Sequence, residues 1–344
     1  MQTLTITRPD DWHVHFRDGL ILKHTVLATA RHFSRALIMP NLRPALSSVD
    51  ELIAYRQRIL ASLELPQSFT PYMTLYLNEK VKGEEFEQAK KSPFILGAKL
   101  YPAGATTNSD EGVQSITALY PLLDLMQQQD LVLQIHGEIT EGDIFDREAR
   151  FIQMCLKPLT LNFPKLRIVL EHISTKAAVE FVKETTEQVV ATITPHHLFY
   201  NRNQLLAGGI RPHYYCLPIL KRESDQLALQ QVAISGNRKF FAGTDSAPHI
   251  KTSKENTCGC AGIYSAPYAV AIYAQVFDGL DKLDKLNNFL SNFGAEFYQL
   301  PINSSDLILK KIPQLIPKSL PLGLDEVVPV AAGESLDWSV HESE

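Results

Sequence analysis

The sequence has few cysteines, and none of them is arranged to bind a metal. Its 344 residues include four cysteines, and no pair has the Cys-x-x-Cys spacing that is typical of thiolate zinc sites and redox motifs. Cys258 and Cys260 form the only close pair, which we interpret as part of a loop. The sequence therefore predicts reduced thiols without disulfides, as in cytoplasmic proteins.

Long apolar runs and runs of one charge are also missing. No stretch approaches the ~18 apolar residues that a membrane-spanning helix needs. The N-terminus lacks the basic, apolar and small-residue zones of a secretory signal peptide. The net charge is −5 and is not concentrated in any block. We therefore expect a cytoplasmic protein that binds neither membranes nor nucleic acid.

The chain does contain a regular alternation of short apolar and longer amphipathic segments. Eight segments have the composition of strands: residues 11–16, 36–39, 69–77, 94–101, 131–136, 166–172, 189–194 and 239–244. Helical periodicity is seen at residues 20–32, 49–63, 81–90, 115–129, 148–157, 176–183 and 225–234. This alternation predicts an α/β fold, a (β/α)8 TIM barrel. A doubly wound open sheet is the alternative, but no Gly-rich phosphate turn follows the first strand.

We expect residues 1–344 to form one domain, with an N-terminal strand and a C-terminal helical or extended tail packed on the barrel. Polar side chains stand at the carboxyl ends of the predicted strands: His13, His15, Asn41, Lys99, His136, His172 and Asp245. In a barrel these ends meet at one face, where active sites lie. Isolated ionisable groups are costly there unless they are paired or metal-bound, so their convergence predicts a metal centre.

The donor set indicates which metal would bind. Four histidines and one aspartate without a thiolate suit zinc best, with manganese, cobalt or iron as alternatives. These ligands are too many for one catalytic ion with an open position, so two ions sharing a bridge fit better. Lys99 leaves two alternatives, because an ammonium about 4 Å from a divalent ion would be repelled by several kcal/mol. Either Lys99 points away, or it is neutral and carries CO2 as a carbamate that bridges the ions.

Arg17 follows His13 and His15 at the same spacing. If the first strand continued that far, alternation would place all three side chains on one side. A planar guanidinium beside a metal site is suited to a substrate carboxylate.

Six motifs together resemble those of one enzyme family. They are HVHFRD (13–18), MPNL (39–42), KLYPAGATT (99–107), EHIS (171–174), LPILK (217–221) and GTDSAPH (243–249). The pattern is similar to the amidohydrolase superfamily and, within it, to the bacterial stand-alone dihydroorotases, which are homodimers. The tail through Trp338 also has that family's character.

The resemblance implies two Zn²⁺ per subunit bridged by N6-carboxylated Lys99. His13, His15 and Asp245 would complete one zinc site, and His136 and His172 the other. The implied reaction is the reversible cyclisation of N-carbamoyl-L-aspartate to L-dihydroorotate in pyrimidine biosynthesis. A zinc-bridged hydroxide would be available near neutral pH, and Asp245 would act as base and then acid.

The resemblance also assigns the substrate contacts. The implied set is His15, Arg17, Asn41, Thr106, Thr107, His136, Leu217, His249 and Ala261. Arg17, Asn41 and His249 would hold the substrate carboxylate, while backbone groups near Leu217 and Ala261 would meet the ring edge. Thr106 and Thr107 lie in a segment, residues 101–111, whose Gly, Ala, Thr and Asn content is typical of a mobile loop. The alternative is a tolerant surface turn, whereas the resemblance implies a lid that excludes water from the bound substrate. His196 and His197 are expected to be structural.

Two alternatives remain at this point. One is another cyclic-amide hydrolase, similar to hydantoinase or allantoinase, although Arg17, Asn41 and His249 favour a substrate with a carboxylate. The other is a catalytically inactive barrel that serves as a scaffold, although no expected metal ligand is missing from the sequence.

Overall fold

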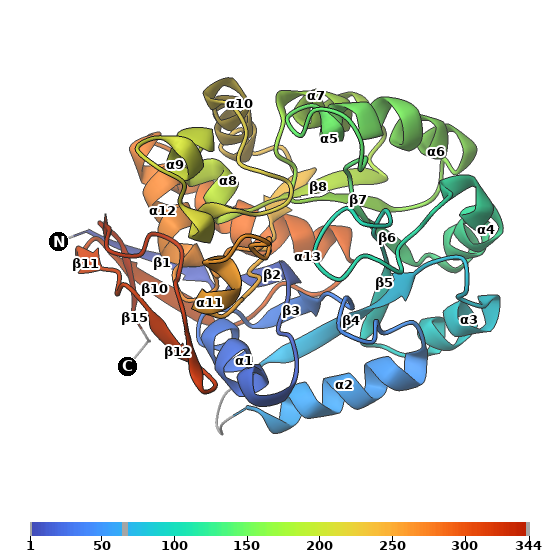
Figure 1. The fold of residues 1–344 in the computed structure, drawn as a ribbon, viewed down its shortest axis with the longest axis horizontal. Helices are drawn as coiled ribbons and strands as arrows, with labels where there is room; N and C mark the ends of the chain where they lie inside the picture. The colour runs from blue at the N-terminus through green and yellow to red at the C-terminus, as the bar shows by residue number, and fades with distance from the viewer. Residues whose placement is uncertain (1, 64–67, 342–344) are drawn as a thin grey trace.

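The computed structural model describes residues 2–63 and 68–341 and has a parallel sheet of eight strands at its centre (Figure 1). The strands are β2 (Asp10–Val14), β3 (Arg35–Ile38), β4 (Thr70–Leu77), β5 (Ile95–Leu100), β6 (Val132–His136), β7 (Ile168–Glu171), β8 (Val189–Ile193) and β9 (Phe240–Ala242). They pair in chain order. Just beyond the last strand, the sheet closes on β2 because Asp245 N donates to His13 O (2.8 Å) and His15 N donates to Ser246 O (3.0 Å). The predicted barrel is confirmed.

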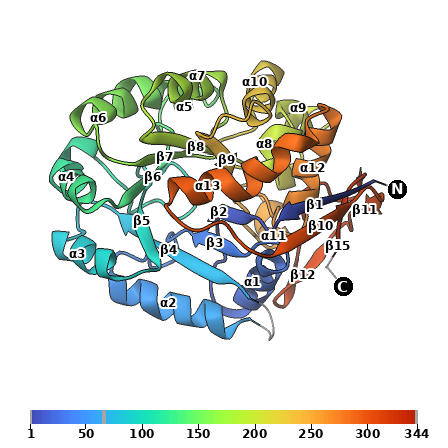
Figure 2. The ribbon, with the colours of Figure 1, turned by 180° about the vertical axis from the view of Figure 1, so that it is seen from behind.

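Helices surround the sheet, as Figures 1 and 2 show. They are α1 (Leu22–Ala30), α2 (Val49–Ala61), α3 (Gly83–Lys91), α4 (Tyr120–Gln129), α5 (Arg147–Phe151), α6 (Lys157–Asn162), α7 (Lys176–Glu184), α8 (Pro195–Phe199), α9 (Arg202–Leu206), α10 (Glu223–Ala233), α11 (Lys251–Lys254), α12 (Ala269–Gly279) and α13 (Phe293–Phe297). The helix predicted at residues 148–157 runs from α5 through a π-helical turn, η3 (Ile152–Leu156), into α6. The start of α2 is fixed by a capping box, in which Ser48 and Glu51 satisfy each other's backbone N–H groups.

The inside of the barrel is filled by large apolar side chains from several strands. This cluster of buried side chains comprises Trp12, Leu37, Met39, Val132, Val169, Val190, Phe241, Ala295 and Tyr298. The ring of Trp12 stacks on that of Tyr298, the residue just after α13, and the ring centroids are 4.5 Å apart. Gly294 permits this approach, because a Cβ at that position would lie 1.9 Å from Trp12 Nε1. Because the interior is packed, functional groups are expected at the carboxyl-terminal mouth of the barrel.

The chain after α13 is mostly extended and returns to the N-terminus. The strand β1 (Thr3–Thr7) pairs with β10 (Asp306–Lys310), which also pairs with β15 (Ser339–His341). Two further small pairs join β11 (Gln314–Leu315) to β14 (Ser335–Leu336) and β12 (Leu320–Leu322) to β13 (Asp325–Val327). The first and last described strands, β1 and β15, thus lie in one three-stranded sheet (Figures 1 and 2).

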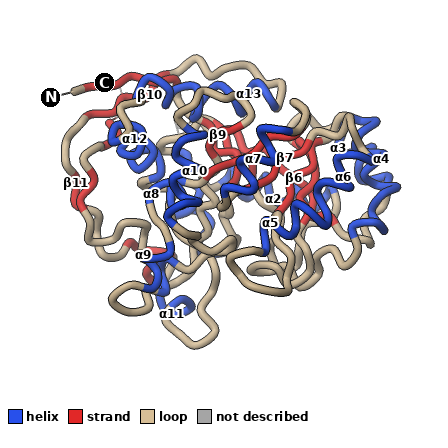
Figure 3. The backbone as a smooth tube through the Cα atoms, turned by 90° about the horizontal axis from the view of Figure 1, so that it is seen from above, coloured by secondary structure: helices blue, strands red, loops and turns tan. Residues whose placement is uncertain are grey.

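Figure 3 shows α9, α11 and several long loops on one side of the molecule, with α13 on the other. Because α11 follows β9, the loops and α11 mark the carboxyl-terminal mouth of the barrel. Among the described residues, no helix combines the length and apolar character needed to cross a bilayer.

One detail of the sequence interpretation is wrong. The first barrel strand ends at Val14 and does not continue to Phe16, so strand alternation does not place Arg17. Instead Arg17 has a left-handed backbone (φ 61°), and this turn brings its side chain to the mouth.

Candidate active site

The predicted site residues gather around one pocket at the barrel mouth. Its lining comprises His13, His15, Arg17, Asn41, Tyr101, Thr106, Thr107, His136, His172, Leu217, Asp245, Ala247, Ala261 and Gly262. Two predicted residues lie just outside this lining. Lys99 is fully buried, with Nζ 5.0 Å from the ring centroid of Tyr101. His249 packs behind Arg17, with its Nε2 3.1 Å from Arg17 Nη2.

The histidines and the aspartate form a tight cluster. His13, His15 and Asp245 each offer a ligand atom, and these atoms lie within 4.8 Å of one another. His15 Nε2 is 3.1 Å and His13 Nε2 is 3.4 Å from Asp245 Oδ1. On the other side, His136 Nδ1 lies 3.3 Å from His172 Nε2. The five side chains therefore form two adjacent groups.

The backbone directs these side chains inward where the strands end. His172 follows β7 with φ 40°, and Asp245 follows β9 with φ 45°. A left-handed conformation is costly for a residue with a side chain and persists only where the surrounding structure enforces it, often at functional sites. Both residues would point elsewhere if the strands simply continued.

Burial sets the protonation of the cluster. It holds the pKa values of His13 and His172 well below the usual range, so both imidazoles are neutral and have a lone pair available. Burial acts to raise the pKa of Asp245, but the hydrogen bond from His15 and electrostatic interactions with His13, His15 and Lys99 outweigh it and lower that pKa to about 2. Asp245 is therefore ionised at neutral pH.

Lys99 lies in the site as a buried amine. Its Nζ is buried without a hydrogen-bond partner among the described residues. Burial lowers its pKa to about 8, although Glu171 and Asp245 act in the opposite direction. Neutral imidazoles, an ionised carboxylate and an unpartnered amine together fit a divalent metal centre. The described residues thus provide a candidate metal site.

Further buried side chains lie behind the cluster and contact its histidines. Glu171 Oε2 lies 2.9 Å from His13 Nδ1, and Thr192 Oγ1 donates to the same oxygen at 2.5 Å. Thr192 Oγ1 also accepts from His172 N at 2.7 Å. Asp11 joins the first and last strands, accepting from Thr244 N (2.8 Å) and Oγ1 (2.6 Å). Glu171 belongs to the EHIS motif, but no sequence pattern assigned a role to it, to Thr192 or to Asp11.

Another buried carboxylate stands behind His136. Glu138 Oε2 lies 3.5 Å from His136 Nε2, and Glu138 Oε1 accepts from Lys221 Nζ at 3.2 Å. Lys221 also donates to Ile144 O (3.0 Å). Lys221, the lysine of the LPILK motif, therefore holds the carboxylate that contacts His136.

The segment 101–112 covers the pocket. Thr107 Oγ1 donates to Ala261 O (3.0 Å), and Asn41 Nδ2 donates to Thr107 O (2.9 Å). Asn108 Nδ2 donates to Asn41 O (3.0 Å). The remaining cavity is about 20 Å³, far below the ~300 Å³ or more of ordinary ligand pockets. The pocket in this conformation therefore contains little free space.

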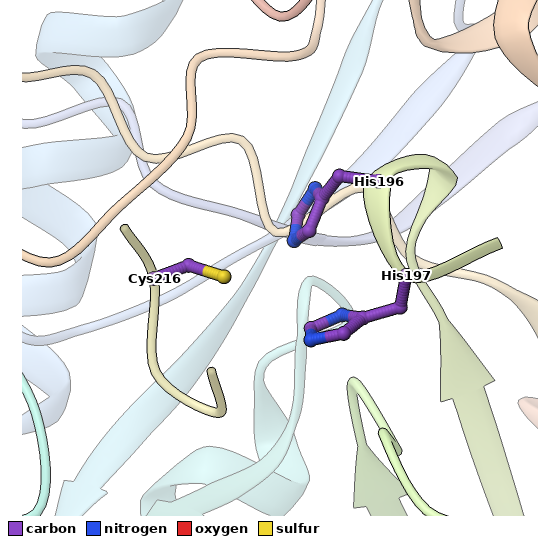
Figure 4. Close-up of side chains that lie close together, drawn as sticks. All are labelled: His196, His197 and Cys216. Carbon is purple, nitrogen blue, oxygen red and sulfur yellow. The ribbon is translucent and has the colours of Figure 1, made fainter. Parts of the chain in front are cut away.

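A further cluster of possible ligands lies outside the pocket lining (Figure 4). His196, His197 and Cys216 are buried, with ligand atoms within 4.8 Å of one another. His197 already contacts Thr194 Oγ1 through Nδ1 (2.8 Å) and Pro218 O through Nε2 (3.1 Å). Cys216 Sγ donates to the same carbonyl at 3.1 Å. Two of the three side chains are therefore engaged in holding the segment around Pro218.

Comparison with known proteins agrees with this geometry. The model of the amidohydrolase family matches residues 6–331. A dihydroorotase from Shewanella denitrificans is 54% identical over 342 residues, covering 99% of each chain. The structure of dihydroorotase from Campylobacter jejuni has a TM-score of 0.91 at 37% identity, covering 99% of this chain and 98% of that one.

A second solved structure was determined with a ligand. Dihydroorotase from Saccharomyces cerevisiae in complex with 5-fluoroorotic acid has a TM-score of 0.90 at 35% identity, covering 99% of both chains. The resemblance inferred from the motifs is thus confirmed over nearly the whole length. The chain belongs to the amidohydrolase family and, within it, to the dihydroorotases.

Proposed function

We propose that this protein interconverts N-carbamoyl-L-aspartate and L-dihydroorotate, acting as a cytoplasmic homodimer in pyrimidine biosynthesis. The full-length similarity to dihydroorotases supports the reaction class. The observation that supports the substrate is Arg17, whose Nη1 is buried without a hydrogen-bond partner among the described residues. A guanidinium that lines a pocket and lacks a protein carboxylate is suited to a substrate carboxylate.

The proposed metal centre holds two Zn²⁺ ions. His13, His15 and Asp245 would bind one ion, His136 and His172 the other, and carboxylated Lys99 would bridge them. When bound, the ions supply Lewis acidity at the scissile carbonyl and a nucleophilic water near neutral pH. The pKa of Lys99, lowered to about 8 by burial, supports carboxylation, because only the neutral amine reacts with CO2.

The side chains of the chain have the following roles in ring opening. Asp245, ionised at neutral pH, accepts the proton that water loses as it attacks the ring carbonyl carbon. As the carbon–nitrogen bond breaks, Asp245 returns that proton to the ring nitrogen. Ring closure runs through the same steps in reverse. His15 steadies the carboxylate of Asp245 through the contact of 3.1 Å.

The remaining side chains bind and enclose the substrate. Arg17, Asn41 and His249 would hold its carboxylate, and His15 and His136 would face the reacting end. The backbone at Leu217 and Ala261 would meet the ring edge. Thr106 and Thr107 would close over the substrate and exclude water, which the present contact between Thr107 Oγ1 and Ala261 O supports.

The test compares substrates with and without the carboxylate. The purified zinc-loaded enzyme should open L-dihydroorotate and not dihydrouracil, the same ring without the carboxylate. Arg17→Met should lower kcat/KM for L-dihydroorotate by about 10²- to 10³-fold, because a desolvated carboxylate loses its charged partner. Turnover of dihydrouracil or a neutral hydantoin in place of L-dihydroorotate would refute the proposed substrate and favour a hydantoinase-like activity.

A further inference from the structure

Lys254, the last residue of α11, is a buried lysine outside the site described above. It is 3% exposed. Its Nζ donates three hydrogen bonds to backbone carbonyls: Tyr215 O at 2.7 Å, Cys260 O at 2.8 Å and Gly262 O at 2.7 Å. An ammonium group has three donors, so every donor is used.

This arrangement is unusual because no carboxylate among the described residues forms an ion pair with Lys254. Burial lowers the pKa of Lys254 to about 8. A buried ammonium is costly unless its hydrogen bonds are fully satisfied. The three carbonyls must therefore converge on Nζ, which constrains the segments that carry them.

One of these segments contains Ala261. Cys260 O and Gly262 O point to Lys254, whereas Ala261 O, between them, accepts from Thr107 Oγ1 at 3.0 Å and lies 3.0 Å from His249 Nε2. The carbonyls on both sides of Ala261 are thus held by Lys254 Nζ. These bonds constrain the backbone at Ala261, which lines the pocket.

The other segment contains Leu217. It is held on one side by Lys254 through Tyr215 O, which also accepts from Gly262 N at 3.0 Å. On the other side, Pro218 O is held by His197 and Cys216, at 3.1 Å each. Figure 4 shows these two side chains approaching from different parts of the chain. Lys254 therefore links the Leu217 segment to the Ala261 segment.

We propose that Lys254 is a positioning residue for substrate recognition, holding the backbone at Leu217 and Ala261 in the geometry that binds the substrate ring. The inference rests on the proposed function, which assigns the ring edge to those two backbone segments. Lys254 is neither a metal ligand nor part of the pocket lining, so it acts on binding and not on the reacting atoms.

The test is Lys254→Met in the zinc-loaded enzyme. We expect KM for L-dihydroorotate and Kd for 5-fluoroorotate, measured by calorimetry, to rise about tenfold or more, because three carbonyls lose a charged donor. The value of kcat should stay within about threefold and the metal content should be unchanged. Unchanged KM and Kd in this folded variant would overturn the proposal.

Lys239→Met is the matched control. Lys239 is also buried, and its Nζ donates to Thr185 O (2.7 Å). Lys239 directly precedes β9 and therefore lies at the amino-terminal end of that strand, away from the mouth. We expect this variant to lower Tm without raising KM. An equal rise of KM in Lys239→Met would show that Lys254 has only a general structural role.

A second variant covers the case in which Lys254→Met does not fold. Lys254→Arg keeps the charge. A planar guanidinium, however, cannot direct three N–H groups from one nitrogen toward the three carbonyls. KM and Kd should again rise while kcat is retained, and an unchanged KM would count against the proposal. If the wild-type enzyme does not turn over L-dihydroorotate, the proposed function fails, whereas failure of the Lys254 variants alone refutes only the positioning role.

Discussion

Glu171 Oε2 lies 2.9 Å from Nδ1 of His13, and both side chains are fully buried. This contact leaves Nε2 of His13 as the nitrogen that faces Asp245. A carboxylate behind a histidine ligand fixes the ring orientation and increases its basicity. In the proposed metal centre, Glu171 would therefore orient His13 to bind the metal through Nε2.

Glu171→Gln should weaken metal binding, because His13 loses the carboxylate that orients its ring. We expect metal affinity to fall by about 10- to 100-fold, the usual effect of removing such a partner. Competition with a chromophoric chelator measures it. Glu148→Gln is the control, since Glu148 is a buried carboxylate that accepts from Ser174 and Thr175 instead of a histidine. Equal affinity in the wild type and Glu171→Gln would contradict the role of Glu171.

Lys99→Ala tests the bridging ligand. Because Lys99 Nζ has no other partner among the described residues, its loss should remove most bound metal and abolish activity. Small carboxylic acids that occupy the vacated space should restore part of the activity. Metal analysis and rate measurements on one preparation check this, and wild-type metal content and rate would rule out a bridging role.

Asp245→Ala separates metal binding from proton transfer. We expect much of the metal to remain, held by His13 and His15, while turnover falls by roughly 10²- to 10⁴-fold, the range of general acid–base catalysis. Single-turnover kinetics with quantified metal distinguishes the two effects. A rate within a few-fold of the wild type would exclude Asp245 as the acid and base.

His32 should make the fold sensitive to acid. Burial lowers its pKa from 6.5 to about 3, so the unfolded chain binds a proton more readily than the folded one. The contribution of His32 to stability is therefore fully present above pH 6.5 and is lost as the pH falls from 6.5 toward 3. As the pH falls through this range, the free energy of unfolding of the wild type should decrease more steeply than that of His32→Gln. The difference in slope should be up to about 1.4 kcal/mol per pH unit.

Urea denaturation between pH 4 and pH 7 measures that difference. His24→Gln, which replaces an exposed histidine on α1, the helix that ends just before His32, should retain the wild-type slope. The same slope in the wild type and His32→Gln would show that His32 does not contribute.

The strands and the barrel mouth could be predicted because their signals are local. Each strand is a short apolar run, and parallel strands bring their carboxyl ends together whatever the helices between them do. His136 and Asp245 are recognisable for this reason, and the motifs around them are specific. Strand boundaries were less certain: β2 stops at Val14, and the turn at Arg17 depends on a left-handed φ that no apolar pattern reveals.

Glu171 shows why the support of the site could not be predicted. Strand alternation would place it on the opposite face from His172. The strand ends at Glu171, however, and the positive φ of His172 brings both side chains to the same site. Lys254 is similar, because the segment KTSKEN looks like a charged surface. Only folding brings the carbonyl of Tyr215 to its ammonium group, beside the nearby carbonyls of Cys260 and Gly262.

The sequence by itself therefore determined the barrel, the family and the ligand types, because apolar periodicity and motif spacing are properties of neighbouring residues. The tertiary structure decided which atoms face one another. The contact between Glu171 and His13, the bond from Lys254 to Tyr215 O and the bond from Thr107 to Ala261 O all join segments that are distant in the chain. Such contacts depend on how strand ends and loops pack, and no local pattern encodes them.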